Sequence, residues 1–144
     1  MTIQRILVAT DGSAGADRAV EAAAELAKAF DGELLIVTLG GNFPAEEIQK
    51  LVRAEGSVGD ANELLSNRIL LEAKERAQHA GAPKISIRSG WGDPATGIVD
   101  AVHRDQPDIL VVGRRGRGQL AGLLLGSVSH KLVSLAPCMV FVIP

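Results

Sequence analysis

The most informative part of this chain is the stretch Ile109-Leu110-Val111-Val112-Gly113-Arg114-Arg115-Gly116, followed after nine residues by Gly126-Ser127. Its apolar run predicts a buried strand, and the pattern from Val128 onward predicts a helix. A helix begins with unpaired N–H groups and about half a positive charge. Glycines directly before it let an anion approach these groups, because no Cβ stands in the way. The stretch therefore predicts a phosphate-binding element.

Short apolar runs alternate with longer amphipathic ones along the rest of the chain. The runs that predict strands are residues 6–9, 33–39, 85–87, 108–112 and 138–143. Apolar residues at helical spacing lie between them or follow them, in residues 19–30, 64–77, 98–102 and 127–135. Such alternation favours right-handed crossovers and a parallel sheet covered on both faces. We therefore expect residues 1–144 to form one α/β domain, an open doubly wound sheet with helices on both faces.

Local signals refine these boundaries. Pro44, with acidic residues after it, is typical of a helix start, and so is Asp93 with the proline that follows it. Asp60 with Glu63 three residues on resembles a capping box, which predicts a helix start there. Trp91 lies between two glycines after the third strand. We expect it to pack over the helix that follows.

Composition excludes several classes of protein. Hydrophobic residues make up 47% of the 144 residues and aromatic ones 3%, which predicts an aliphatic core. The net charge of −2 argues against nucleic-acid binding and against a membrane-surface role. A single cysteine, Cys138, allows no internal disulfide and fits a reducing compartment. With no secretory leader in the N-terminal residues, these features predict a cytoplasmic protein.

A second loop with chemical potential follows the first predicted strand, at Thr10-Asp11-Gly12-Ser13. Asp11 either accepts hydrogen bonds from a ribose hydroxyl or caps the next helix. The phosphate-loop motif G-x-x-x-x-G-K-S/T is absent, and the dinucleotide motif G-x-G-x-x-G is absent after the first strand. These absences argue against a P-loop NTPase and a standard NAD enzyme. No His, Cys or Asp residues show metal-ligand spacing, so we expect no metal site.

The spacing of Gly113, Gly116, Gly126 and Ser127 resembles the nucleotide-binding signature G-x2-G-x9-G-S/T of the universal stress protein family. Residues 6–13, 108–113 and 126–140 are similar to that family too, so the resemblance spans the whole chain. It implies a fold similar to that of adenine nucleotide α-hydrolases, with five parallel strands in the order 3-2-1-4-5. This order places the loops after strands one and four side by side at the switch point.

The resemblance also implies an ATP site. We expect any Mg²⁺ to arrive together with the phosphates, because this ion binds through substrate phosphates. Thr10 and Asp11 would meet the nucleoside, with Asp11 on the ribose, and Val37 and Thr38 would border the adenine. Arg115 is the best candidate for a charged contact to phosphate. The residues implied along the ribose and phosphate path are Val112, Gly113, Arg115, Gly116, Gly126, Ser127, Val128 and Ser129.

We expect an ATP-binding regulatory protein of the stress-response type, without catalytic residues. One alternative is an enzyme that hydrolyses ATP slowly or cleaves it at the α-phosphate. Another is a dimeric scaffold that binds a protein partner without nucleotide. The apolar residues 139–143 form a terminal strand whose edge invites pairing, and family members often pair this strand antiparallel. We therefore expect a homodimer through the C-terminal strand, acting on a protein partner that the sequence does not identify.

Overall fold

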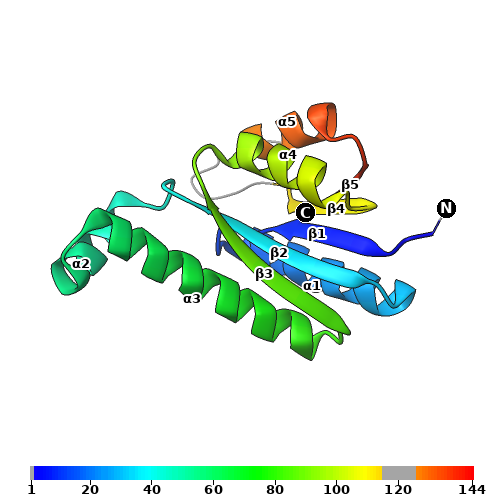
Figure 1. Ribbon diagram of the computed structural model, residues 1–144, viewed down its shortest axis with the longest axis horizontal. Coiled ribbons are helices and arrows are strands. Elements are labelled where there is room, and N and C mark those ends of the chain that lie inside the picture. The colour runs from blue at the N-terminus through cyan, green and yellow to red at the C-terminus, as the bar shows by residue number, and fades with distance from the viewer. Residues whose placement is uncertain (1, 115–125) are drawn as a thin grey trace.

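The computed structural model describes residues 2–114 and 126–144 of the chain. Strands and helices alternate along these residues (Figure 1). The elements, in chain order, are β1 (Arg5–Ala9), α1 (Ala14–Phe30), β2 (Glu33–Gly40), α2 (Ala45–Glu55), α3 (Val58–His79), β3 (Lys84–Trp91), α4 (Pro94–Asp105), β4 (Ile109–Gly113), α5 (Ser127–Leu135) and β5 (Met139–Ile143). No helix in the described part of the chain combines the length and the apolar character needed to cross a bilayer.

The strands form one sheet in the order β3-β2-β1-β4-β5, and each neighbouring pair runs parallel. Strand β1 is central, since its Val8 pairs with Ile36 of β2 on one side and Val111 of β4 on the other. The chain leaves β1 toward β2 on one side and leaves β4 toward β5 on the other, so the switch point lies between the carboxyl ends of β1 and β4. The predicted fold and strand order are confirmed.

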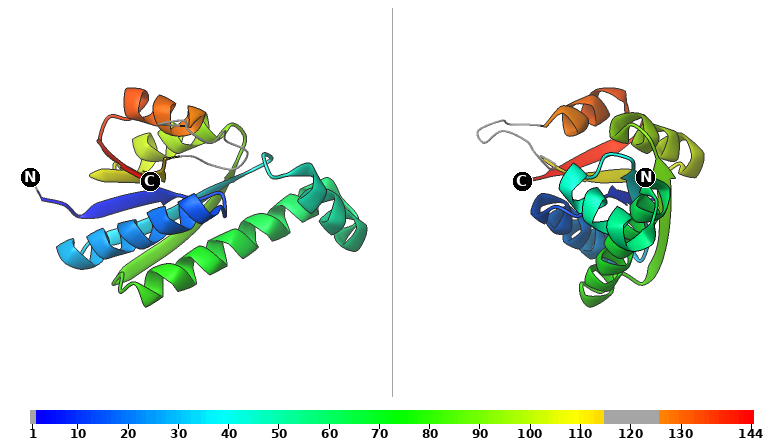
Figure 2. Two further views of the ribbon diagram at one scale, coloured as in Figure 1. Left: turned by 180° about the vertical axis from the view of Figure 1, so that it is seen from behind. Right: turned by 90° about the vertical axis from the view of Figure 1, so that its left-hand side faces the viewer.

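Helices cover both faces of the sheet (Figures 1 and 2). Alternate residues of a strand point to opposite faces, so Val8 packs toward α1 and α3 while Leu7 packs toward α4 and α5. The contact between α1 and the sheet is close because α1 contributes small side chains, among them Ala19, Ala23 and Ala27, all fully buried. The aliphatic core expected from the composition is therefore divided into two layers.

The helix starts agree with the sequence at α4 but not at α3. The Asp93 carboxylate caps α4, accepting a hydrogen bond from Thr96 N at 3.0 Å. Helix α3 is capped by Ser57, whose Oγ accepts from Asp60 N at 3.1 Å. The capping box predicted at Asp60 is wrong, because the helix begins at Val58, immediately after the extended Ser57. Asp60 then lies in the first turn, where an acidic side chain interacts favourably with the positive end of the helix dipole.

Trp91 has a different neighbour from the one predicted. It is the last residue of β3, where it pairs with Gly40 of β2. A Cβ added at Gly41 would lie 3.1 Å from Trp91 Cε2, so the indole lies directly against the end of β2. The extra length of β3 explains the difference, because it places Trp91 in the sheet instead of in the loop before α4.

A mutation at Leu110 tests the part of the core that lies between the sheet and the helices α4 and α5. Its side chain is 0% exposed in β4. We expect Leu110→Ala to lower the free energy of unfolding by about 3 kcal/mol, because it removes buried methyl groups and leaves a cavity. Leu71→Ala is the control, since Leu71 on α3 is 60% exposed and should change stability by less than about 0.5 kcal/mol. Urea unfolding measures the free energy of unfolding of both variants. Equal losses of stability would contradict the buried position of Leu110.

Candidate functional site

A cavity of about 360 Å³ opens at the carboxyl ends of β1 and β4. This is the switch point, where ligands bind in open α/β sheets, and the volume suits a small ligand. Four parts of the chain form its wall. The stretch from the end of β1 to the start of α1 contributes Ala9, Thr10, Asp11, Ser13 and Ala16; the β4–α5 region contributes Val112, Gly113, Gly126, Ser127, Val128 and Ser129; the end of β2 and the loop after it contribute Leu39, Asn42 and Phe43; and the start of α4 contributes Asp93, Pro94 and Ile98.

The loop after β1 is held by its own side chains. Thr10 Oγ1 accepts from Gly12 N at 3.1 Å, and Asp11 Oδ1 accepts from Ser13 N at 2.9 Å. Ser13 Oγ in turn accepts from Ala16 N at 3.2 Å and caps α1. Of the two interpretations of Asp11, the helix cap is therefore wrong, because Ser13 fills that position. Asp11 shapes the turn and lines the cavity instead.

Arg114 and Gly126, the described residues on either side of 115–125, are hydrogen-bonded to each other. Arg114 N donates to Ile143 O at 2.7 Å, which continues the β4–β5 pairing. Gly126 N donates to Arg114 O at 2.8 Å. The hydroxyl of Ser129, a buried residue, lies 2.7 Å from Arg114 O and 3.1 Å from Gly126 O. These contacts fix the start of α5 to the end of β4.

Helix α5 begins beside the cavity with N–H groups that have no hydrogen-bond partner among residues 2–114 and 126–144. Its N-cap is Gly126, and no side chain in the described part of the chain caps it, whereas Ser13 caps α1. The first hydrogen bond within the helix runs from His130 N to Gly126 O at 3.0 Å. The N–H groups of Ser127, Val128 and Ser129 precede that bond, so they have no intrahelical partner. The cavity wall thus includes the positive end of a helix dipole.

Gly113 allows close packing between β4 and α1. An added Cβ would lie 3.2 Å from Gly15 O, in the first turn of α1. This distance is shorter than ordinary van der Waals contact, so Gly113 lets the end of β4 approach α1 closely. The sequence predicted a phosphate-facing turn here, formed together with Gly116. Arg115 and Gly116, both predicted phosphate neighbours, lie outside the described residues.

The residues that β2 contributes to the wall differ from those implied for the adenine. Val37 lies in the core, where its carbonyl accepts from Thr10 N at 2.9 Å, and Thr38 is buried; neither lines the cavity. Leu39, two residues after Val37, lies on the same face and reaches the cavity. Strand periodicity from Val37 could have identified Leu39. No local pattern marks Asn42 or Phe43, which come from a loop.

The two charged side chains on the described wall are both acidic, Asp11 and Asp93. Hydrogen bonds from the backbone N–H and the hydroxyl of Thr96 hold the pKa of the Asp93 carboxyl below its usual range. Asp93 is therefore ionised at neutral pH. Among residues 2–114 and 126–144, no group of His, Cys, Asp and Glu side chains is arranged to hold a metal ion.

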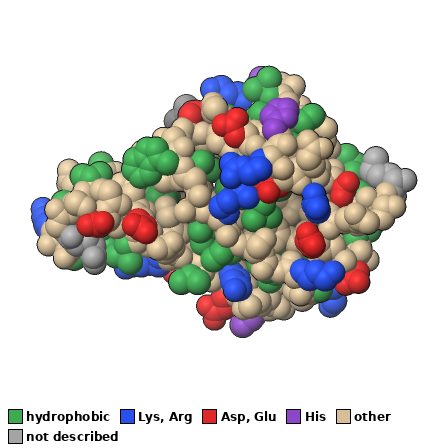
Figure 3. Space-filling view, viewed as in Figure 1, with side chains coloured by type: hydrophobic (Ala, Val, Ile, Leu, Met, Phe, Trp, Pro, Cys, Tyr) green, Lys and Arg blue, Asp and Glu red, His purple; other side chains and the backbone are tan. Residues whose placement is uncertain are grey.

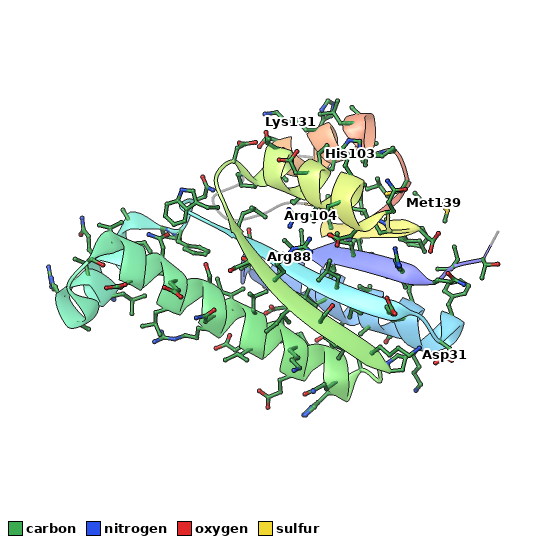
Figure 4. All side chains as sticks on the ribbon, in the orientation of Figure 1. Asp31, Arg88, His103, Arg104, Lys131 and Met139 are labelled. Atoms are coloured by element: carbon green, nitrogen blue, oxygen red, sulfur yellow. The ribbon has the colours of Figure 1, made fainter. Side chains whose placement is uncertain are left out.

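Basic side chains gather outside the cavity. Figure 3 shows Lys and Arg side chains near the middle of one face, and Figure 4 places Arg88 and Arg104 there. Arg88 forms an ion pair with Asp105 at the end of α4, and this hydrogen bond holds the pKa of the Asp105 carboxyl below its usual range. Neither arginine lines the cavity.

A cavity at the switch point of a parallel sheet, beside an open helix N-terminus, is typical of nucleotide-binding α/β proteins. The sequence pattern of the Universal stress protein family matches residues 2–144. The chain belongs to this family.

Individual relatives agree with this assignment. The universal stress protein Rv1636 of Mycobacterium tuberculosis is 37% identical over 128 residues, which cover 85% of this chain and 84% of that protein. A crystal structure of a universal stress protein in complex with cAMP is 32% identical, with a TM-score of 0.72 over 99% of this chain and 98% of that chain. UspA from Lactobacillus plantarum has the same fold, with a TM-score of 0.82 at 21% identity over 100% and 99% of the two chains.

Ser129 tests the joint between β4 and α5. We expect Ser129→Ala to lower the free energy of unfolding by about 1 kcal/mol, because the buried hydroxyl no longer bonds to Arg114 O. Ser134→Ala is the matched control, since the exposed Ser134 bonds to His130 O at 3.1 Å in the same helix. Chemical unfolding compares the two variants. If Ser129→Ala lost no more stability than Ser134→Ala, the Ser129 hydroxyl would not stabilise the contact between β4 and α5.

Proposed function

We propose that this protein binds an adenine nucleotide in the cavity at the carboxyl ends of β1 and β4, and that ATP is its ligand. The observation that carries the proposal is the uncapped start of α5 on the cavity wall. N–H groups at a helix start bind phosphate oxygens, and the dipole favours the negative charge. The family membership of the chain and the cAMP complex of a 32% identical relative support an adenine nucleotide.

The cavity wall suggests how the nucleotide is oriented. The phosphates lie at the N–H groups of Ser127 and Val128, and the ribose hydroxyls donate to Asp11. The base lies against the apolar side of the wall, formed by Leu39, Phe43 and Ile98. A cyclic monophosphate is the second candidate ligand, because the relative bound to cAMP covers 99% of this chain.

We infer that the protein acts through binding, as a stress-response regulator, and not as an enzyme. On the described wall, the hydroxyl oxygens of Thr10 and Ser13 accept from backbone N–H groups, and that of Ser129 lies beside backbone carbonyls. These contacts support a structural role for these three hydroxyls over a nucleophilic one. A regulator of this kind works by binding its ligand more tightly in one conformation than in another.

Calorimetric titration with ATP, AMP, cAMP and GTP tests the ligand, and product analysis after incubation with ATP tests the enzyme alternative. We expect ATP to bind, and Gly126→Val to weaken that binding at least about tenfold, because its side chain covers the N–H groups at the start of α5. At φ −73° and ψ 169°, Gly126 has a backbone conformation that valine adopts. Unfolding curves check that the variant is folded.

Gly59→Val is the matched control, since no heavy atom lies within 4 Å of a Cβ added at Gly59 in α3. This variant should bind like the wild type. A wild-type protein that binds none of these nucleotides would overturn the proposal. Release of ADP, or of AMP and pyrophosphate, at a steady rate would favour the enzyme alternative.

We also propose that two copies of the chain pair through β5. This strand ends the sheet, so one of its edges has no neighbouring strand within the described residues. Met139 and Phe141 on β5 are 37% and 38% exposed, although they are large and apolar. An unprotected apolar edge favours pairing with another strand, and antiparallel pairing of β5 with itself closes a twofold dimer.

Phe141→Glu tests this dimer. We expect the wild type to sediment as a dimer and the variant as a monomer, because the new carboxylates would be placed in the apolar contact between the two strands. Phe30→Glu is the control, since Phe30, the last residue of α1, is 48% exposed and is not part of β5. This variant should remain dimeric. A wild-type monomer at micromolar concentration would contradict the proposal.

A further inference from the structure

Helix α2 is attached to the edge of the molecule. It lies on the end of α3 that extends beyond the sheet (Figures 1 and 2). None of its described side chains is fully buried; Ile48, Leu51 and Val52 are half-buried on a helix that packs against α3. A helix with so little buried surface opens at low free-energy cost, so its order depends strongly on what holds its ends.

The N-terminal end of α2 is joined directly to the cavity. Asn42 and Phe43 line the cavity, and α2 begins at Ala45 after Pro44 at the N-cap. No side chain of the described residues caps this helix start. Proline restricts the backbone between the cavity wall and the first turn. A ligand that contacts Phe43 therefore acts within two residues of α2.

The segment that leads into α2, residues 40–44, is hydrogen-bonded to the loop between β3 and α4. The Asn42 side-chain amide donates to Gly92 O, and Gly92 N donates to Gly40 O at 3.2 Å. Gly92 immediately precedes Asp93, which also lines the cavity. The loops after β2 and β3 are thus tied together at the cavity, and a ligand there touches both.

Asn62 links the same segment to α3. This side chain is 4% exposed, its Oδ1 accepts from Gly41 N at 3.0 Å, and its Nδ2 donates to Val58 O at 2.8 Å. Val58 begins α3, immediately after the turn that ends α2. Asn62 is not part of the cavity wall. It therefore connects both ends of the α2 segment without touching the ligand site.

Glycines in left-handed conformations bracket the segment. Gly41 has φ +93° and Gly56 has φ +89°, values that other residues rarely adopt. Each marks a sharp change of chain direction, one before Asn42 and one after α2. Hinges consist of a few residues at the ends of elements that absorb changes in φ and ψ. Gly41 and Gly56 are placed so that α2 could move between them as a unit.

We propose that residues 42–55 form an arm that reports whether the cavity is occupied. Ligand contact with Asn42 and Phe43 stabilises the hydrogen bonds between the loops after β2 and β3. Asn62, which bonds to Gly41 and Val58, then stabilises the segment at both ends of α2. The arm then presents α2 in an ordered form when nucleotide is bound and in a more open form when it is not. This inference rests on the proposed function, because it requires a ligand in the cavity.

Amide hydrogen exchange with and without the ligand that calorimetry identifies tests the arm. At saturation we expect exchange in α2 to slow at least about threefold, with no change in the buried middle of α1 as the internal reference. Trp91 gives a second readout, because it is the only tryptophan in the chain and lies against Gly40 and Gly41. Its emission and its quenching by acrylamide should change over the same ligand range.

Asn62→Ala separates the arm from the site. We expect it to bind nucleotide within about threefold of wild type but to lose the ligand-dependent protection of α2. Asn67→Ala, at an exposed position of the same helix, should behave as wild type. Circular dichroism checks folding, and if Asn62→Ala does not fold, the wild-type exchange and fluorescence data decide alone.

The outcomes separate the two proposals. If ligand binds and protects residues 126–130, while α2 exchange and Trp91 emission stay unchanged, the arm is overturned and the nucleotide site stands. If Asn62→Ala keeps full protection of α2, the route through Asn62 is overturned. If no nucleotide binds, the proposed function fails and the arm fails with it.

Discussion

The candidate site depends on the N–H groups at the start of α5, which no side chain of the described residues caps. A helix that begins beside a cavity without a side-chain cap leaves several donors that only solvent or a ligand satisfies. The structure holds these donors in place through contacts with the end of β4, since Gly126 N and the Ser129 hydroxyl both bond to Arg114 O. The start of the helix is therefore rigidly placed while its N–H groups remain available.

The sheet brings the other parts of the site to this helix. Strand β1 lies between β2 and β4, so the loop that carries Asp11 emerges beside the end of β4. Gly113 allows β4 and α1 to approach, and Ser13 rather than Asp11 caps α1. The glycine and the aspartate of the two motifs thus have structural roles in addition to any contact with a ligand. Motif residues at such sites satisfy packing, turn geometry and binding at once.

The sequence was most informative where a local pattern had one physical cause. Apolar periodicity identified all five strands, and Gly126 was correctly placed at the start of a helix. It was least informative where two local signals competed. Asp60 resembled a cap, but Ser57 is extended and precedes the first helical residue, so Ser57 caps α3. Val37 and Leu39 share one face of β2, but Leu39 lies two residues nearer the carboxyl end of the strand and therefore reaches the cavity instead.

The sequence by itself determined the type and order of the elements and the glycine-rich end of β4, because these depend on residues close together in the chain. The strand order followed from the resemblance to a family, not from periodicity. Only the tertiary structure decided which side chains share the cavity. Asn42 meets Gly92, and Asn62 meets Gly41, across separate elements. Contacts of this kind depend on how the elements pack, and no spacing within a single segment records them.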